Sequence, residues 1–287
     1  MLAIVILNYN TWTETCDCIQ SIKCYAPSHN YKIYVVDNAS SEKIPPHIYE
    51  SINGDEKIEL LWNCDNKGYA AGNNVGIKKA LEDNCSCCLI CNSDVRFVDD
   101  SINKMCFFQH TTTDAGIIGP QIYDVNGRFQ PFYMMCKLTG IGKLKNMALH
   151  TPFRVFFKDF EHRFILKHEI DSPQKVFGVS GCCFLISREC LDYLYPLDEN
   201  TFLYEEEYII GVRIEKSPYN AYIIPNTHVI HAHGASTGGM NEFSYNCLIK
   251  SEQYYLKEYI NEIIFVRYII LIIRLLLRHF IVKRKLK

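Results

Sequence analysis

The sequence predicts an α/β fold with a mostly parallel central sheet flanked by helices and followed by a helical C-terminal extension. Short apolar runs alternate with helical patterns along the first third of the chain. Polar residues come directly after these runs, where ligands bind in open α/β sheets. A chain of 287 residues with 48% hydrophobic side chains is long enough for one such domain with an appendage.

The first third contains four candidate strands with helices between them. Residues 2–7 form a β-rich run that ends in Asn-Tyr-Asn, and residues 11–25 have a helical pattern. Residues 31–36 form a second run, which the polar segment 37–41 follows at once. The runs 58–62 and 88–91 predict two more strands, separated by a Gly- and Asn-rich turn and a helix over residues 74–82. This alternation indicates parallel pairing with covered sheet faces.

The rest of the chain is less regular. Residues 120–175 lack clear periodicity, which is typical of a functional loop region or an insertion with irregular helices. Residues 176–186 return to the pattern of a buried strand, and they contain Gly178 and Gly181, which mark close approach of another group to the backbone. The pattern is helical beyond Asn241, so we expect a domain over residues 1–240 and a helical extension over residues 241–287.

Charge is distributed unevenly along the chain. The formal net charge is −2, but residues 263–287 carry seven Lys or Arg and no Asp or Glu. Residues 1–262 carry 23 basic and 32 acidic side chains. A nucleic-acid-binding protein would line a groove of its own fold with positive charge, so we expect no nucleic-acid partner.

The basic residues of the tail interrupt an apolar helical pattern over residues 263–282. Arg267, Arg274, Arg278 and Lys285 fall within about 20° of one line on a helix. Spanning a bilayer would place Arg274 near its centre at a cost of about 3 kcal/mol, whereas a helix in the membrane plane lets the arginines meet anionic headgroups. We therefore expect a basic amphipathic helix that associates with a membrane surface. The alternative is a helix packed on the body or on a second subunit, and a homodimer is compatible with the sequence.

Fourteen cysteines raise the question of disulfides or zinc. The opening MLAIVILNYN has no basic segment and no cleavage site of a secretory signal, so we expect no export and reduced thiols. Cys85, Cys87, Cys88 and Cys91 have no second Cys or His pair at the spacing of a zinc module. We expect these thiols to act as small buried hydrophobic side chains, with zinc as the alternative.

Several segments, in this order, carry a family resemblance: ILNYN (6–10), VVDNASS (35–41), NKGYAAGNNVG (66–76), LICNSDV (89–95), and then PLDENTFLYEEEYIIGVR (196–213) with VIHAHGAS (229–236). Together they resemble family 2 glycosyltransferases with the Rossmann-like GT-A fold, especially the rhamnosyltransferase-like branch of bacterial surface-polysaccharide biosynthesis. The resemblance covers residues 3–237. It implies a hexosyl- or rhamnosyltransferase that moves a sugar, with inversion, from a nucleoside-diphosphate sugar to a hydroxyl of a glycan or polyprenyl-linked acceptor.

The resemblance also implies an organisation and a place of action. Residues 1–119 correspond to a nucleotide-sugar-binding half and residues 120–240 to an acceptor half. The implied pathway is the synthesis of capsule, O-antigen or another cell-surface polysaccharide. With the basic tail helix, this predicts a cytoplasmic enzyme that is peripheral on the inner face of the plasma membrane.

The resemblance implies a donor site built from amides, one carboxylate and glycines. Asp37 can accept hydrogen bonds from a base or ribose, although an Asx-turn residue would look the same. The segment 66–76 resembles the donor-binding loop of the family, although a helix packed closely on a strand has similar glycine spacing. The implied donor-binding residues are Asn8, Asn10, Asp37, Asn38, Asn66, Gly68, Gly72, Asn73, Asn92 and Ser93.

Asp94 and His231 are the expected metal ligands. The sequence Asn92-Ser93-Asp94 stands where the family carries its metal-binding Asp-x-Asp or Asn-x-Asp motif. Mg²⁺ or Mn²⁺ needs few protein oxygens when a diphosphate supplies others, so one carboxylate can suffice. His231 falls on the family's V-x-H-x-x-G-x-S position, which implies a place near the diphosphate, as a metal ligand or as a hydrogen-bond donor. His233 is the weaker candidate.

The acidic run 205–207 is the expected source of the general base. Inverting transfer needs a carboxylate that takes the proton of the acceptor hydroxyl. The family pattern is Glu-Asp followed by x-Asp-Leu, so Glu207 replaces the usual catalytic Asp and Ile209 replaces the second Asp. The base therefore lies between Glu207 and Glu206. A solvated acidic helix start is the alternative reading of this run.

The departures from the family pattern at Asn92, Glu207 and Ile209 leave a second function open. This alternative is a catalytically impaired sugar-nucleotide-binding or scaffold protein that keeps the GT-A fold. A nicotinamide dehydrogenase is disfavoured, because the first strand leads into Asn-Tyr-Asn instead of the glycine fingerprint that such cofactors require.

Overall fold

A computed structural model describes residues 1–25, 30–131, 133–149, 155–157, 160, 164–232 and 240–283, with side chains of the last helix up to residue 278. The strands are β1 (Leu2–Asn8), β2 (Tyr31–Asp37), β3 (Ile58–Trp62), β4 (Cys87–Asn92), β5 (Val95–Phe97), β6 (Ala115–Gly119), β7 (Ile122–Tyr123), β8 (Tyr133–Met134), β9 (Ile165–Leu166), β10 (Gln174–Val176), β11 (Cys183–Ser187), β12 (Asn220–Ile223) and β13 (Val229–His231). The helices are α1 (Trp12–Cys24), α2 (Pro46–Asn53), α3 (Tyr69–Glu82), α4 (Ser101–Thr111), α5 (Gly140–Ala148), α7 (Arg188–Leu194), α8 (Glu206–Ile214), α9 (Glu242–Tyr254), the π-helix η2 (Tyr255–Tyr259) and α10 (Ile264–Lys283).

An eight-stranded sheet in the order β10-β12-β6-β11-β4-β1-β2-β3 forms the centre of the molecule. The pairs β1–β2, β1–β4, β2–β3 and β6–β12 are parallel, whereas β11 runs antiparallel to both β4 and β6, and β10 runs antiparallel to β12. The predicted mostly parallel α/β sheet is therefore confirmed. Asn8 lies opposite Asp37 and Leu7 opposite Asn92, so three strands end together at one edge.

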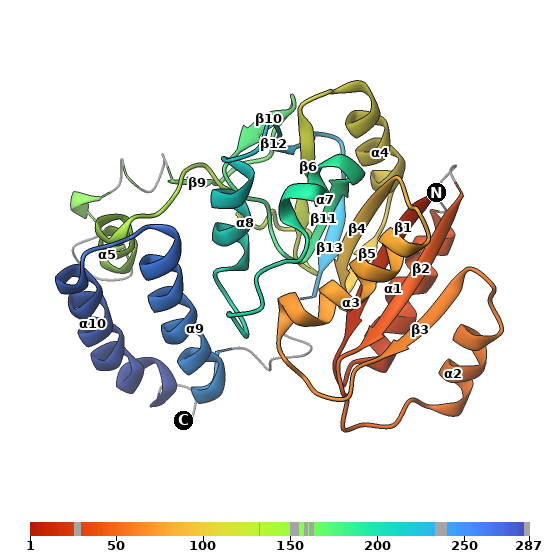
Figure 1. Cartoon of the computed structure of the whole chain (residues 1–287), viewed down its shortest axis with the longest axis horizontal. Coiled ribbons are helices and arrows are strands. Elements are labelled where there is room, and N and C mark those ends of the chain that lie inside the picture. The colour runs from red at the N-terminus through yellow and green to blue at the C-terminus, as the bar shows by residue number, and fades with distance from the viewer. Residues whose placement is uncertain are drawn as a thin grey trace.

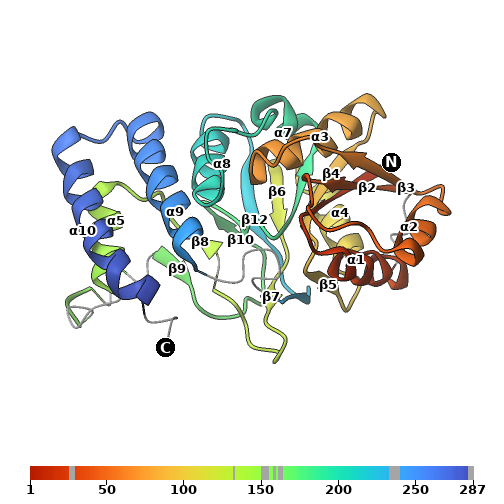
Figure 2. The same ribbon diagram turned by 90° about the horizontal axis from the view of Figure 1, so that it is seen from below.

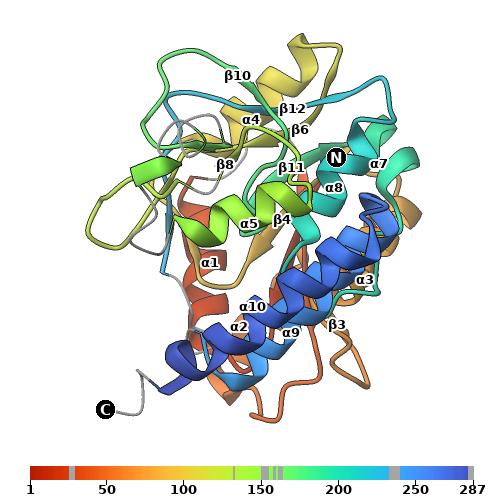
Figure 3. The same cartoon turned by 90° about the vertical axis from the view of Figure 1, so that its left-hand side faces the viewer.

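Helices cover both faces of the large sheet. Figure 2 shows α3 and α7 on one side of the sheet and α1 on the other. Helix α3 packs so closely on β1 that a side chain at Gly76 would begin 2.3 Å from Val5 Cγ1. Smaller sheets, β5-β13-β7 and β8-β9, complete the domain. Beyond α8, away from the sheet, α9 and α10 pack together with α5 (Figures 1 and 3).

The predicted burial of the cysteine cluster is confirmed. Cys85, Cys87, Cys88 and Cys91 are all buried, and the last three lie on β4 in the main hydrophobic core. None of the fourteen cysteines forms a disulfide bond. The thiols therefore fill space in the centre of the sheet as small apolar groups.

Two predicted boundaries were wrong. Helix α3 begins at Tyr69 instead of residue 74, because Gly68 adopts a φ of 97° and ends the preceding loop there. Residues 69–76 of the glycine-rich segment are therefore helical. The segment 176–186 is not one strand: β10 ends at Val176 and β11 begins at Cys183. In the sheet, β12 and β6 lie between these two strands. Residues 177–182, which connect them, must therefore pass across both β12 and β6.

The arginine stripe of the tail faces the protein. Arg274 forms two hydrogen bonds, of 2.8 and 2.7 Å, with the carboxylate of Glu252 on α9, and Arg278 pairs with Glu242 on the same helix. Lys285 lies outside the described residues. The prediction that these arginines face headgroups is corrected, because α9 supplies acidic partners for them.

The outward face of α10 is apolar instead. Ile270 is fully buried in a second hydrophobic cluster with Phe177, Val212 and Leu256, which fixes the extension to α8 and η2. The opposite face carries large exposed apolar side chains: Ile264, Phe265, Tyr268, Ile272, Leu275 and Leu276. Within the described part of the chain, no helix has the length and apolar character that crossing a membrane requires.

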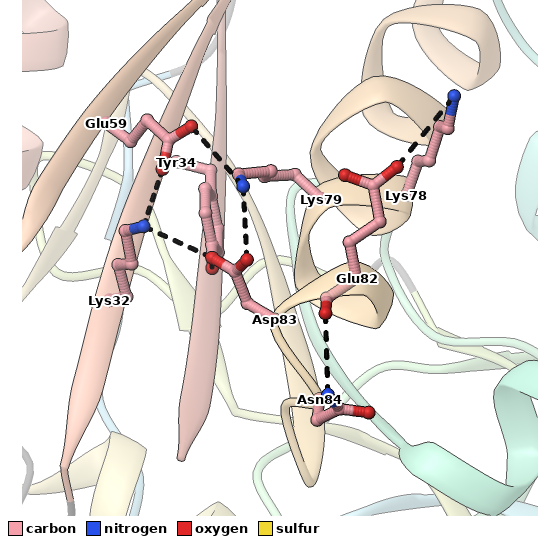
Figure 4. Close-up of polar contacts among 8 residues, drawn as sticks. All are labelled: Lys32, Tyr34, Glu59, Lys78, Lys79, Glu82, Asp83 and Asn84. Carbon is pink, nitrogen blue, oxygen red and sulfur yellow. Dashed lines mark hydrogen bonds and ion pairs between the residues drawn. The ribbon is translucent and has the colours of Figure 1, made fainter.

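A polar network ties α3 to strands β2 and β3 (Figure 4). Asp83 accepts hydrogen bonds from the hydroxyl of Tyr34 at 2.7 Å and from Lys79 and Lys32 at 3.1 and 3.2 Å. Lys32 also donates to Glu59 on β3 at 2.5 Å. The bond from Tyr34, supported by the two lysines and opposed by burial, lowers the pKa of Asp83 to about 2.

Replacing Asp83 with asparagine should lower the free energy of unfolding at pH 7 by about 1 kcal/mol, because three donors lose a charged acceptor. Since the pKa of Asp83 is lower in the folded chain, this stabilisation is present above the unfolded pKa of about 4 and is lost as the pH falls toward 2. Urea denaturation at pH 7, 5 and 3 should show that the difference in the free energy of unfolding between the variant and the wild type becomes smaller as the pH falls. Glu82→Gln is the control, since Glu82 lies 3.9 Å from Lys78 in an exposed pair. Equal losses of unfolding free energy in Asp83→Asn and Glu82→Gln would contradict the stabilising role assigned to Asp83.

Candidate active site

A cavity of about 600 Å³ opens at the carboxyl ends of β1, β2 and β4. Its walls combine amides, one carboxylate and aromatic rings. The lining residues are Leu7, Tyr9, Asn38, Asn66, Gly68, Tyr69, Asn92, Ser93, Asp94, Phe202, Leu203, Asn241, Phe243 and Ser244.

Asn8 lies beneath this cavity and does not line it. Its side chain is fully buried, and its amide nitrogen donates to Asp37 Oδ1 at 2.7 Å and to Ser40 Oγ at 3.1 Å. Its amide oxygen accepts from the hydroxyls of Thr11 at 3.2 Å and Thr15 at 2.8 Å. Asn8 therefore supports the loops that surround the cavity.

Asp37 and Asn10 hold the loop that follows β2. Asp37 accepts hydrogen bonds from the backbone amide of Ser40 at 3.1 Å and from its hydroxyl at 2.5 Å. Asn10 has a φ of 56°, and its side-chain oxygen accepts from the amide of Glu42 at 3.0 Å. This is the turn geometry that the sequence left open as the alternative for Asp37. Each carboxylate oxygen has two lone pairs, and Asp37 Oδ2 uses one of them for this turn.

Asn38, Asn66 and Gly68 form one wall of the cavity. The Asn38 amide donates to Asn66 Oδ1 at 2.9 Å and to the Gly68 carbonyl at 3.2 Å. A side chain at Gly68 would begin 2.3 Å from the carbonyl oxygen of Phe202, so only glycine permits this approach. Gly72 and Asn73, by contrast, lie in α3 and are buried, and neither lines the cavity.

Asp94 and His231 meet at the end of β4. The antiparallel pairing of β13 with β5 places His231 opposite Val95, and Asp94 Oδ1 lies 3.3 Å from His231 Nε2. Burial alone would lower the pKa of His231, but Cys182 and the Asp94 carboxylate raise it to about 10. His233 and residues 234–236 lie outside the described residues.

This pair provides two donors that suit a hard divalent cation. No group of three or more His, Cys, Asp or Glu in the described ranges is placed to hold a metal ion. Mg²⁺ and Mn²⁺ commonly take one or two protein ligands and complete their shell with substrate phosphates and water. A carboxylate and an imidazole beside an open cavity fit the cation that the sequence implies, and binding of the cation would release the proton that the raised pKa of His231 keeps on the imidazole.

Glu207 lies beside the cavity, next to Gly181. Its Oε1 accepts a hydrogen bond from the Gly181 amide at 3.1 Å, and the hydroxyl of Tyr69, which lines the cavity, donates to the Gly181 carbonyl at 2.5 Å. A side chain at Gly181 would begin 2.8 Å from Glu207 Oε1 and 3.5 Å from the Tyr69 hydroxyl oxygen. Gly181 is therefore needed for this close arrangement.

All three glutamates of the acidic run have raised pKa values. Burial raises the pKa of Glu207, whereas hydrogen bonds from backbone amides, including that of Gly181, lower it. Burial and then the charge of Glu207 raise the pKa of Glu206 well above its usual range. Within the described structure, Glu206 Oε1 is buried without a hydrogen-bond partner. The run is therefore not the solvated acidic helix start that the sequence left open.

The segment 181–182 lies between the two groups of functional side chains. Because β11 runs antiparallel to β4, the residues before β11 lie beside the end of β4, and the Asn92 amide donates to the Cys182 carbonyl at 2.8 Å. Glu207 contacts the same segment at Gly181. The Asn92-Ser93-Asp94 motif and the acidic run are thus brought to one region.

Several lining residues were not predicted from the sequence as site residues. Tyr69 stands inside a recognised motif, but its contact with Gly181 links residues 112 positions apart. Phe202 and Phe243 meet edge to face with ring centroids 5.4 Å apart, and Phe243 comes from the first turn of α9. The helical extension therefore supplies part of the cavity wall, which its helical pattern alone does not indicate.

Two known proteins are similar to this chain in sequence. Low-salt glycan biosynthesis hexosyltransferase Agl10 of Haloferax volcanii is 24% identical over 220 residues, which cover 76% of this chain and 63% of that protein. N-acetylglucosaminyl-diphospho-decaprenol L-rhamnosyltransferase of Mycobacterium tuberculosis is 25% identical over 152 residues, which cover 52% of this chain and 48% of that protein. The chain thus spans 63% and 48% of the lengths of these two relatives.

Solved structures share the fold. The crystal structure of GalNAc-T7 with UDP, GalNAc and Mn²⁺ superposes with a TM-score of 0.60 at 15% identity, over 90% of this chain and 51% of that one. The crystal structure of S. aureus TarS superposes with a TM-score of 0.55 at 12% identity, over 90% of this chain and 40% of that one. The predicted GT-A fold is confirmed. Residues 3–194 match the model of the family described as glycosyl transferase family 2, and the chain belongs to this family.

Proposed function

We propose that this family 2 glycosyltransferase moves a hexosyl or rhamnosyl group from a nucleoside-diphosphate sugar to a hydroxyl of a glycan or polyprenyl-linked acceptor, with inversion and with a divalent cation. The observation that carries the proposal is that Asp94, His231 and Glu207 surround one short segment beside one cavity. One relative is named for glycan biosynthesis and another for a diphospho-decaprenol-linked sugar, which supports this acceptor class. We include in this proposal a role in capsule, O-antigen or other cell-surface polysaccharide synthesis.

In this proposal the donor occupies the amide-rich part of the cavity. Asn38, Asn66, Gly68, Asn92 and Ser93 contact the sugar nucleotide, since all five line the cavity. The other predicted donor-site residues act mainly by supporting that wall, and they are Asn8, Asn10, Asp37, Gly72 and Asn73. The donor half is then residues 1–119, and residues 120–240 form the acceptor half.

Asp94 and His231 hold the cation in this proposal. A Mg²⁺ or Mn²⁺ ion held there would supply positive charge for the departing nucleoside diphosphate. The chain itself contributes a fixed carboxylate, because β4 and β13 position the pair and both side chains are largely buried. Little reorganisation of these two side chains is then needed when the donor binds.

Glu207 is the preferred general base. The Gly181 amide orients its carboxylate, whereas Glu206 is more deeply buried. The base accepts the proton of the acceptor hydroxyl while that oxygen attacks the anomeric carbon, on the face opposite the leaving diphosphate. The raised pKa of Glu207 brings the carboxylate closer to the working pH, which favours proton transfer.

The apolar face of α10 is proposed to rest on a membrane surface. Its exposed side chains lie on the face opposite the Glu252–Arg274 pair, and the sequence continues from α10 into the basic residues 283–287. An apolar helix face flanked by positive charge is typical of helices that lie in the interface of anionic membranes. This arrangement would make the protein peripheral on the inner face of the plasma membrane, close to a lipid-linked acceptor.

Asp94→Asn should lower kcat for sugar transfer by at least about 10²-fold, because one protein ligand of the cation loses its charge. The fold should be kept, and the Mn²⁺-dependent rise in melting temperature with the nucleotide sugar should disappear. Asp192→Asn, which changes an exposed surface pair with Arg188, is the control and should match the wild type. Full transfer by Asp94→Asn would refute the metal assignment. Donor binding by the wild type without turnover would favour the sugar-nucleotide-binding or scaffold alternative.

Glu207→Gln should lower kcat by about 10²- to 10⁴-fold, and Glu206→Gln should have a smaller effect. Because the base acts without its proton and its pKa is raised, wild-type kcat should fall as the pH drops through a value above the usual glutamate pKa of about 4.3. The measurement is kcat from pH 5 to 9 for all three proteins. A larger loss in Glu206→Gln would move the base to Glu206. Full activity in both variants would exclude the acidic run as the source of the general base.

Phe265→Glu should weaken binding to vesicles that contain phosphatidylglycerol by at least about tenfold, since one buried aromatic side chain contributes about 2 kcal/mol. Phe107→Glu on α4 is a matched control, because the two side chains are 68% and 69% exposed. Vesicle sedimentation measures binding to the membrane, and light scattering measures the molar mass of the protein in solution. A wild-type dimer that Phe265→Glu dissociates, without vesicle binding, would assign this face to a second copy of the chain.

A further inference from the structure

Four charged side chains lie together where the acidic run meets the C-terminal extension: three are buried, and the side chain of Arg274 is 14% exposed. Lys143 on α5 is 3% exposed, and its Nζ donates to both carboxylate oxygens of Glu205 at 2.6 and 2.7 Å. Glu252 on α9 is fully buried, and its Oε1 lies 4.0 Å from the same Nζ. Arg274 on α10 binds the Glu252 carboxylate with two hydrogen bonds. Two positive and two negative charges are therefore balanced away from water.

This cluster holds an unusual turn. Tyr204 and Glu205 have φ values of 73° and 71°, a conformation that non-glycine residues rarely adopt. The Glu205 carbonyl accepts from the Ile209 amide at 2.9 Å in the first turn of α8. The hydroxyl of Ser251 on α9 donates to the Leu203 carbonyl at 2.8 Å. Helices α5 and α9 thus fix the turn from two sides.

The turn determines where the next two carboxylates point. Glu206 and Glu207 are the first residues of α8, so their direction follows from the conformation of Glu205 immediately before them. In addition, the Lys143 ammonium lies 4.2 Å from the centre of the Tyr208 ring, which follows the two glutamates. Side chains of the extension are therefore connected to the proposed base through Lys143.

We propose that Lys143 is a positioning residue, which holds the turn that aims the two following glutamates, and that the Glu252–Arg274 pair of the extension keeps Lys143 on Glu205. This inference rests on the proposed function. Without Arg274, Glu252 would be a buried carboxylate lacking its charged partner, and it would compete with Glu205 for the Lys143 ammonium. If the charges of Glu252 and Arg274 were both removed, Glu205 would be the one carboxylate left to pair with Lys143.

The test compares Arg274→Met with the double variant Glu252→Gln/Arg274→Met. We expect kcat of the single variant to fall by at least about tenfold, with the KM of the donor within about twofold of the wild type, and kcat of the double variant to return to within about threefold. Arg278→Met is the control, because its partner Glu242 is largely exposed, and it should keep wild-type kcat. A double variant as impaired as the single one would overturn the inference.

Hydrogen exchange at the Ile209 amide gives a readout without catalysis. Exchange should be at least about tenfold faster in Arg274→Met and should return toward the wild-type rate in the double variant. Unchanged exchange in Arg274→Met would overturn the inference, whatever the activity. If the wild type transfers no sugar from any nucleotide sugar, the proposed function fails, and the exchange rates still decide whether the cluster holds the turn.

Discussion

The cavity depends on one buried amide. Asn8 is the last residue of β1, between β2 and β4, and its side chain uses both donors and both acceptor positions for hydrogen bonds. Thr11, one of its partners, also shares a 2.8 Å hydrogen bond with Ser93 after β4. The loops after three strands thus belong to one network. An amide satisfied at every position is stable in a buried place, and any change of it leaves polar groups without partners.

Strand direction explains why chemistry gathers at this edge. Parallel pairing ends β1, β2 and β4 together, so the residues after them become neighbours. One antiparallel strand, β11, begins at the same edge and brings Gly181 and Cys182 against Asn92. Helix α8 then places Glu207 on the other side of that segment. Asp94, the proposed metal ligand, and Glu207, the proposed base, are thereby brought to one region from positions more than 100 residues apart.

Local patterns predicted the first four strands, helix α1 and the polar residues after the strands, because apolar periodicity within a short window decides these elements. The beginning of α3 was misplaced, because the conformation of Gly68 depends on its contact with Phe202 far along the chain. The arginine stripe was recognised, but its direction depended on Glu252 and Glu242, which a window on the tail does not contain. Lys143 and Phe243 gave no signal, because each is defined by a contact distant in sequence.

The Lys143 cluster has a consequence for synthesis on the ribosome. Every strand of the large sheet is complete by Ile223, whereas Glu252 and Arg274 are added later. A nascent chain can therefore fold its sheet while the Lys143–Glu205 pair still lacks the neighbouring Glu252–Arg274 pair. The Lys143 ammonium lies over the rings of Tyr208 and Tyr255, which belong to the hydrophobic cluster that also contains Leu256 and Ile270. The left-handed turn at Tyr204 and Glu205 thus gains its full support last, after every strand of the large sheet has been synthesised.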